Sequence, residues 1–189
     1  MNRSPIANDI ETTEMAISII TGANAGGKTT FLRSIGISQW FAQLGLPVPA
    51  QRYRTQVFSG IMTHFPKQED KHMRFGKLAD EMVRIRNDIA IIKNGGLVLL
   101  NESFATTTTR EGVEIATDVI SVLAETGSTV FYVTHFYELA QDINALSNLL
   151  PQGNKAENLV AQADKAARTY KIVKGDPMPW PVDENIGCI

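Results

Sequence analysis

The stretch AISIITGANAGGKTT, residues 16–30, decides the fold class. AISII is typical of a buried strand, a glycine-rich loop follows it, and a helical pattern then runs from about Lys28 to Leu44. The loop GANAGGKT, residues 22–29, fits the phosphate-loop (P-loop) pattern G-x-x-x-x-G-K-[ST] between a strand and a helix. Such glycines let backbone N–H groups turn toward a phosphate, and the helix N-terminus adds its positive end. We therefore predict a nucleotide site in which Lys28 contacts the β- and γ-phosphates and Thr29 ligates Mg²⁺.

Short apolar runs alternate with segments of helical period along the rest of the chain. One segment has an apolar stripe at helical spacing, formed by Leu78, Met82, Ile85, Ile89 and Ile92. Another has a capping box at Thr108 and Glu111 and a terminating glycine at Gly127. We expect strands at 55–62, 97–100 and 129–133, helices at 77–93, 109–125 and 135–146, and a C-terminal β-hairpin from 158–164 and 168–174. This order predicts an α/β fold with a mostly parallel sheet flanked by helices.

Composition limits the possible classes of protein. The chain has 189 residues, 43% hydrophobic residues and a formal net charge of −2, which suits one globular domain and gives no sign of nucleic-acid or membrane binding. Cys188 is the only cysteine, so an internal disulfide is impossible, and no signal peptide or membrane span is apparent. We expect a cytoplasmic protein with a domain at 1–175 and an irregular tail at 176–189. Arg52 and Arg54 are interpreted as a solvated turn.

A second candidate group follows the apolar run in LVLLNESFATTTTREG, residues 97–112. Strand ends in such folds converge on the ligand crevice, so Asn101 and Glu102 should face the phosphates. A glutamate there can orient and deprotonate an attacking water, which is hydrolase chemistry. Phosphate-handling enzymes usually have an aspartate where Asn101 stands, and this difference leaves open whether the chain hydrolyses its nucleotide.

A third candidate group lies in YVTHF, residues 132–136, where Thr134 and His135 follow an apolar strand. A histidine at this strand end can hydrogen-bond the γ-phosphate or the attacking water. His135 is therefore predicted to be functional, whereas His64 and His72 are predicted to be surface residues.

Together, GANAGGKTTFLRSIG, FAQLGLPVPA, LVLLNESFATTTTREG and VFYVTHFYEL resemble the C-terminal ATPase domain of the MutS family of DNA mismatch-repair proteins. The resemblance runs from about Ile6 to Gly175 and implies an ABC-type P-loop NTPase that binds ATP with Mg²⁺ and forms a nucleotide-dependent homodimer. It implies that His135 is the switch histidine and that Ile6 and Asn8 lie near the adenine. It also implies that Gly76 and Lys77 face the nucleotide of the other subunit. The residues implied to form the ATP-binding loop are Gly22, Ala23, Asn24, Ala25, Gly26, Gly27, Lys28, Thr29 and Thr30.

The chain departs from the family pattern at several positions. Ala23 and Ala25 replace the usual Pro and Met, which a loop of backbone amides should tolerate. Gly76 replaces a serine and removes a hydroxyl from the site shared with the partner. Asn101 replaces an aspartate thought to hold Mg²⁺ through water, so we expect weaker Mg²⁺ affinity with hydrolysis retained by Glu102. MutS proteins are several times longer, so we expect an excised domain whose DNA contacts belong to absent parts of a divergent, MutS-like parent protein.

Three hypotheses follow from this sequence. The first is a MutS-type ATPase that hydrolyses ATP slowly and uses ATP or ADP to control dimer closure. The second is a nucleotide-gated dimerisation switch in which Asn101 and Gly76 have abolished useful hydrolysis. The third is a small-molecule P-loop kinase, which Glu102 and the absence of an evident arginine-bearing lid disfavour.

Overall fold

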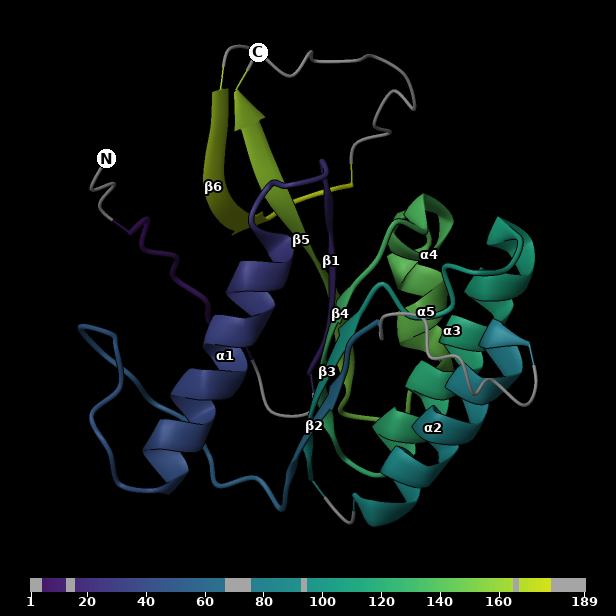
Figure 1. Ribbon diagram of the computed structural model, residues 1–189, viewed down its shortest axis with the longest axis horizontal. Helices are drawn as coiled ribbons and strands as arrows, with labels where there is room; N and C mark the ends of the chain where they lie inside the picture. The colour runs from purple at the N-terminus through teal and green to yellow at the C-terminus, as the bar shows by residue number, and fades with distance from the viewer. Residues whose placement is uncertain (1–4, 13–15, 67–75, 93–94, 165–166, 178–189) are drawn as a thin grey trace.

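The structure is a computed structural model that describes residues 5–12, 16–66, 76–92, 95–164 and 167–177. Figure 1 shows one sheet with α1 on one face and α2 to α5 on the other. This arrangement confirms the predicted α/β architecture, with helices on both faces of the sheet. The elements are β1 (Ala16–Gly22), α1 (Lys28–Gln43), β2 (Ile61–His64), α2 (Lys77–Ile91), β3 (Leu97–Asn101), α3 (Thr109–Glu125), β4 (Thr129–Val133), α4 (Tyr137–Gln141), α5 (Ile143–Leu149), β5 (Lys155–Asp164) and β6 (Ala167–Lys174).

Within the described residues, the strands form a six-stranded sheet in the order β2-β3-β4-β1-β5-β6. Neighbouring strands are parallel except β5 and β6, which form the predicted antiparallel C-terminal hairpin. Two backbone hydrogen bonds continue the ladder beyond the strand ends, from Glu102 N to Val133 O (2.7 Å) and from Thr134 N to Ile20 O (3.1 Å). The carboxyl ends of β1, β3 and β4 therefore lie side by side.

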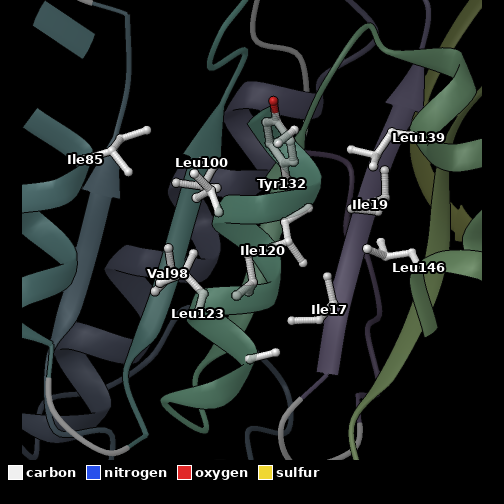
Figure 2. Close-up of a cluster of buried hydrophobic side chains, with 14 of the residues drawn as sticks. Ile17, Ile19, Ile85, Val98, Leu100, Ile120, Leu123, Tyr132, Leu139 and Leu146 are labelled. Carbon is white, nitrogen blue, oxygen red and sulfur yellow. The ribbon is translucent and has the colours of Figure 1, made fainter. Parts of the chain in front are cut away.

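Two apolar clusters hold the sheet between its helices. Figure 2 shows the larger cluster, in which side chains of β1, β3 and β4 pack against α3, α4 and α5. Its labelled members include Ile17, Val98, Tyr132, Ile120 and Leu146. The smaller cluster packs Phe31 and Leu32 of α1 against the opposite face. Full burial of each such side chain stabilises the fold by roughly 1.5–3 kcal/mol, so the strand ends have a firm support.

The helix at 109–125 is confirmed with the predicted bounds, the N-cap half of the predicted capping box and the predicted terminating glycine, while the Glu111 carboxylate accepts from the Thr107 hydroxyl. The Thr108 hydroxyl accepts a hydrogen bond from Glu111 N (3.4 Å), as expected of an N-cap. Gly127 has a φ of 69°, which allows the chain to turn after the helix.

The strand expected at 55–62 is wrong in its first part, because β2 begins only at Ile61. In the segment before β2, glutamine side chains of α1 bind two backbone polar groups that a strand would pair with its neighbour. Gln39 Nε2 donates to Gln56 O (3.0 Å), and Gln43 Oε1 accepts from Phe58 N (2.9 Å). A strand pattern cannot reveal this competition. Arg52 and Arg54 nearby are exposed, as predicted.

Two helical predictions also need correction. The single helix expected at 135–146 is two short helices, α4 and α5, that meet at Asp142, whose side chain accepts a hydrogen bond from Ala145 N (3.3 Å) and caps α5. In α2, which ends at Ile91, Ile85 is buried as expected, but Met82 on the predicted stripe is exposed.

The prediction that His64 is a surface residue is wrong. Its side chain is fully buried at the end of β2 and lies 3.1 Å from Glu81 and 3.2 Å from the Nε of Arg84, both on α2. Arg84 Nε donates to His64 Nδ1, and Arg84 Nη2 lies 2.6 Å from His64 Nε2, the nitrogen that also faces Glu81. His72, the end of the predicted helix at Lys93, and most of the predicted tail at 176–189 lie outside the described residues. None of the helices in the described part of the chain is long and apolar enough to cross a membrane.

Candidate functional site

Three segments meet at the carboxyl ends of β1, β3 and β4. The first is the loop after β1, residues 22–30, which we call the glycine loop. The second brings Asn101 and Glu102 from the end of β3, and the third brings His135 from just after β4. Contacts between these segments, described next, unite the residues that the sequence predicted from three separate motifs.

The glycine loop has a backbone that its glycines make possible. Gly22 has a φ of 123°, and a Cβ there would lie 2.9 Å from the Cβ of Ala161 on β5. A Cβ on Gly26 would lie 2.9 Å from the carbonyl oxygen of Ala23. Larger residues would therefore fill or distort the loop. Ala25 tolerates a φ of 56° at the exposed tip.

Lys28 is buried inside the glycine loop. Its Nζ donates hydrogen bonds to Gly22 O (2.6 Å) and Ala23 O (2.8 Å), and 4% of the residue is exposed. An ammonium group has three donors, so one remains for a ligand after these two bonds. Burial lowers the pKa of Lys28, and the charge of Glu102 partly opposes that shift. An anion bound in the loop would offset the cost of burying this cation.

The two predicted metal-site residues touch. The Thr29 hydroxyl donates a hydrogen bond to Asn101 Oδ1 at 2.9 Å. The described residues contain no group of three or more His, Cys, Asp or Glu side chains able to hold a metal ion. Mg²⁺ in nucleotide sites is usually held by one or two side chains together with phosphates and water. The Thr29–Asn101 pair fits that kind of site, in which Asn101 would offer the metal an uncharged oxygen ligand.

The side chains of Glu102 and His135 are in contact, with Glu102 Oε1 3.0 Å from His135 Nε2. Both side chains are partly open to solvent. Glu102 has a φ of 51°, an uncommon conformation for a residue other than glycine. Backbone strain of this kind persists where the surrounding structure holds it, often at functional sites.

The core anchors the segment that carries Glu102. The Tyr132 hydroxyl donates to Ser103 O (2.8 Å), and burial raises the pKa of Tyr132 well above its usual value. Phe104 is fully buried, although its φ is 65°. The hydroxyls of Ser103 and of Thr21, the residue before the glycine loop, are buried and have no partner among the described residues.

An open cleft of about 2720 Å³ extends from the glycine loop along α1. Its wall includes Ile6 and Asn8 of the N-terminal segment, together with Tyr170 of β6. The volume exceeds that of a typical small-molecule pocket, because the cleft continues along α1 to Tyr53. Ile6 is exposed, whereas the Asn8 amide binds the backbone of β6.

Gly76, Lys77 and Tyr170 lie outside the three segments that form the site at the strand ends. Gly76 and Lys77 begin α2 and are exposed, and nothing in a single chain tests their predicted role toward a partner. No local sequence signal selects Tyr170, because its contact with the glycine loop joins residues far apart in the chain and depends on an irregular strand.

Comparison with known proteins identifies the family. Residues 18–178 match the family model for MutS domain V. The chain is 35% identical to the DNA mismatch repair protein MutS of Thermotoga maritima over 176 aligned residues, and the alignment covers 90% of this chain. It is 30% identical to the DNA mismatch repair protein Msh2 of Dictyostelium discoideum, over 96% of the chain, and 31% identical to the endonuclease MutS2 of Streptococcus equi, over 72%. The chain belongs to the MutS family.

The matched relatives are much longer proteins. The aligned region covers 21% of the Thermotoga MutS, 19% of the Dictyostelium Msh2 and 18% of the Streptococcus MutS2. The chain thus spans about a fifth of the length of these relatives.

Proposed function

We propose that this chain is an ATP-binding and ATP-hydrolysing domain of a MutS-like DNA repair or recombination protein. The observation that carries the proposal is the convergence of Lys28 and Thr29, Asn101 and Glu102, and His135 at three adjacent strand ends. These residue types match the parts needed for phosphoryl transfer to water, which are an anion cradle, a metal site and a base.

Each group has a role in this proposal. The backbone amides of residues 22–30 and the Lys28 ammonium bind the phosphates. Mg²⁺, held beside Thr29 and Asn101, would neutralise charge on the phosphate oxygens. Glu102 takes a proton from the attacking water. The water oxygen forms a bond to the γ-phosphorus as the bond to ADP breaks and ADP leaves. His135, 3.0 Å from Glu102, orients that carboxylate and can donate to the γ-phosphate. Ile6 and Asn8 lie on the adenine side of the cleft.

ATP binding would close a homodimer through this face, and parts of the protein beyond this chain would contact DNA. The names of the relatives support the repair context. Slow turnover is expected from the chain alone, because Gly76 brings no hydroxyl to a shared site and Asn101 brings no charge to the metal.

A second candidate function is a nucleotide-gated dimerisation switch with little or no hydrolysis. Asn101 favours it, because its amide oxygen binds a divalent cation less strongly than a carboxylate would. Both candidates require ATP binding and differ only in turnover.

The discriminating experiment measures phosphate release with Mg·ATP at saturating protein for wild type, Asn101→Asp and Glu102→Gln. Glu102→Gln should lower the rate by about 100-fold or more while ATP still binds, because it removes the base. Asn101→Asp should raise the rate at low Mg²⁺, and the exposed Glu114→Gln serves as a matched control. Tight ATP binding without phosphate release in wild type would reject the ATPase and favour the switch.

A further inference from the structure

Residues 102–104, which we call the Glu102 turn, leave the end of β3 in a strained conformation. Glu102 has a φ of 51° and Phe104 a φ of 65°, values that residues other than glycine rarely adopt. Ser103 lies between them and is almost fully buried. Such a backbone relaxes unless the surrounding structure holds it. The position of the proposed base therefore depends on the groups that bind this turn.

Two consecutive residues of β4 bind the Glu102 turn. Val133 O accepts a hydrogen bond from Glu102 N (2.7 Å), and the Tyr132 hydroxyl donates to Ser103 O (2.8 Å). The first bond continues the ladder between β3 and β4, in which Asn101 pairs with Val133. The second bond comes from a side chain and reaches the middle of the turn, beyond the end of that ladder. Tyr132 therefore holds the part of the turn that the sheet itself does not.

The Tyr132 hydroxyl also contacts the segment that carries His135. It is hydrogen-bonded to the Thr134 side chain, and Thr134 Oγ1 accepts a hydrogen bond from Phe136 N (3.0 Å). Figure 2 shows the Tyr132 oxygen beyond the apolar side chains of the larger cluster, on the side toward which the strands run. One hydroxyl thus joins the two segments on which Glu102 and His135 lie.

Packing alone does not explain a tyrosine at this position. Tyr132 is fully buried in the larger apolar cluster, where a phenylalanine would fill the same space without a polar atom that needs a partner. Burial raises the pKa of the Tyr132 hydroxyl well above its usual value, the Thr134 hydrogen bond partly opposes that shift, and the charge of Glu81 adds to it. The hydroxyl therefore remains protonated at neutral pH and remains a donor to Ser103 O.

We propose that Tyr132 is a positioning residue whose hydroxyl, through Ser103 O, holds the Glu102 carboxylate where it accepts the proton of the attacking water. This role rests on the proposed ATP hydrolysis, and the buried Tyr132 acts only through the Glu102 turn. A general base works only within hydrogen-bond reach of the proton that it removes. Without the Tyr132 bond, the turn relaxes and the carboxylate spends less time in that position. Turnover then falls, whereas ATP binding, which depends on the glycine loop, is retained.

The test measures single-turnover phosphate release and equilibrium binding of Mg·ATP for wild type, Tyr132→Phe, Glu102→Gln and the double variant. Tyr132→Phe removes one oxygen atom and keeps the ring in the core, and thermal melting checks that it folds. We expect Tyr132→Phe to slow phosphate release about tenfold, with the dissociation constant of ATP within about twofold of wild type. In the Glu102→Gln background the same substitution should change the rate by less than about twofold, because no base is left to position.

Thr126→Val is the matched control. The Thr126 hydroxyl also donates to a backbone carbonyl, that of Leu123 at 2.7 Å, but Thr126 lies just before β4, at the opposite edge of the sheet. This variant should keep phosphate release within about twofold of wild type. Slowing equal to that of Tyr132→Phe would show a general effect of losing a buried hydroxyl and would overturn the role of Tyr132.

Other outcomes overturn the inference in distinguishable ways. Equal slowing by Tyr132→Phe in both backgrounds, or a loss of ATP binding, would make Tyr132 a structural residue and leave the proposed hydrolysis intact. Unchanged phosphate release in Tyr132→Phe would show that the hydroxyl does not position Glu102. Failure of wild type to release phosphate would reject the proposed hydrolysis itself, and this inference with it.

Discussion

Two histidine–glutamate pairs lie at carboxyl ends of parallel strands, and they differ in almost everything except distance. His64 and Glu81 are 3.1 Å apart at the end of β2, and His135 and Glu102 are 3.0 Å apart beyond β4 and β3. The His64 side chain is 0% exposed, whereas that of His135 is 44% exposed. Distance alone would make the two pairs equivalent.

The two histidines differ in their other hydrogen-bond partners. Arg84 Nε donates to His64, Arg84 Nη2 donates to Phe65 O at 3.1 Å, and Asp88 lies 3.8 Å from the His64 ring. This buried network binds the edge strand β2 to α2. Within the described part of the chain, His135 has Glu102 as its charged partner, and the ring is otherwise partly open to solvent. A histidine with all its partners supplied by the fold supports structure, whereas one with spare hydrogen-bonding capacity can serve a ligand.

The largest effect expected from this comparison is on stability. His64→Ala should lower the free energy of unfolding by about 2–3 kcal/mol, because it removes a fully buried ring and leaves its partly buried charged partners without the group that joins them. His135→Ala should change it by less than about 0.5 kcal/mol, as expected for a solvent-exposed pair. Urea denaturation followed by circular dichroism measures both, and His64→Gln, which keeps hydrogen-bonding groups, should lose less than His64→Ala. Similar losses in the two alanine variants would contradict the distinction.

The contrast also shows what sequence can predict. The glycine loop, Asn101 and Glu102, and His135 each follow an apolar strand, so local pattern and the geometry of parallel sheets were enough to bring them together. His64 also ends a strand, but its partners lie on α2, and no local signal distinguishes it from an exposed histidine. The same limit applies to Gln56 and Phe58, whose backbone groups bind the side chains of Gln39 and Gln43 on α1. Tyr170 required both a long-range contact and an irregular strand.

A smaller effect is expected on activity. His135→Ala should slow ATP turnover by about tenfold, because removing one hydrogen bond to a charged group costs roughly 1.4 kcal/mol. ATP affinity should change much less, since the glycine loop supplies most phosphate contacts. Single-turnover phosphate release and equilibrium binding separate the two quantities, and His64→Gln is the matched histidine control. A turnover defect in His64→Gln equal to that in His135→Ala would show that both pairs serve the reaction.

The smallest effect expected is that of the buried Lys28 charge on the free energy of unfolding. Burial lowers the pKa of Lys28, so between that lowered pKa and the ordinary value of 10.5 the unfolded chain binds more protons at this residue than the folded chain. Stability from this group therefore rises with pH through that window, and at neutral pH the buried charge opposes folding. Lys28→Met removes the charge and should unfold at a higher urea concentration than wild type at pH 7, with the difference shrinking toward pH 10. A difference independent of pH would mean that Lys28 imposes no electrostatic cost. The expected result would show that two groups at the same edge of the sheet contribute to the free energy of unfolding with opposite signs. The His64 network stabilises the fold, whereas Lys28 in the glycine loop destabilises it. A bound phosphate would offset the cost of that buried charge.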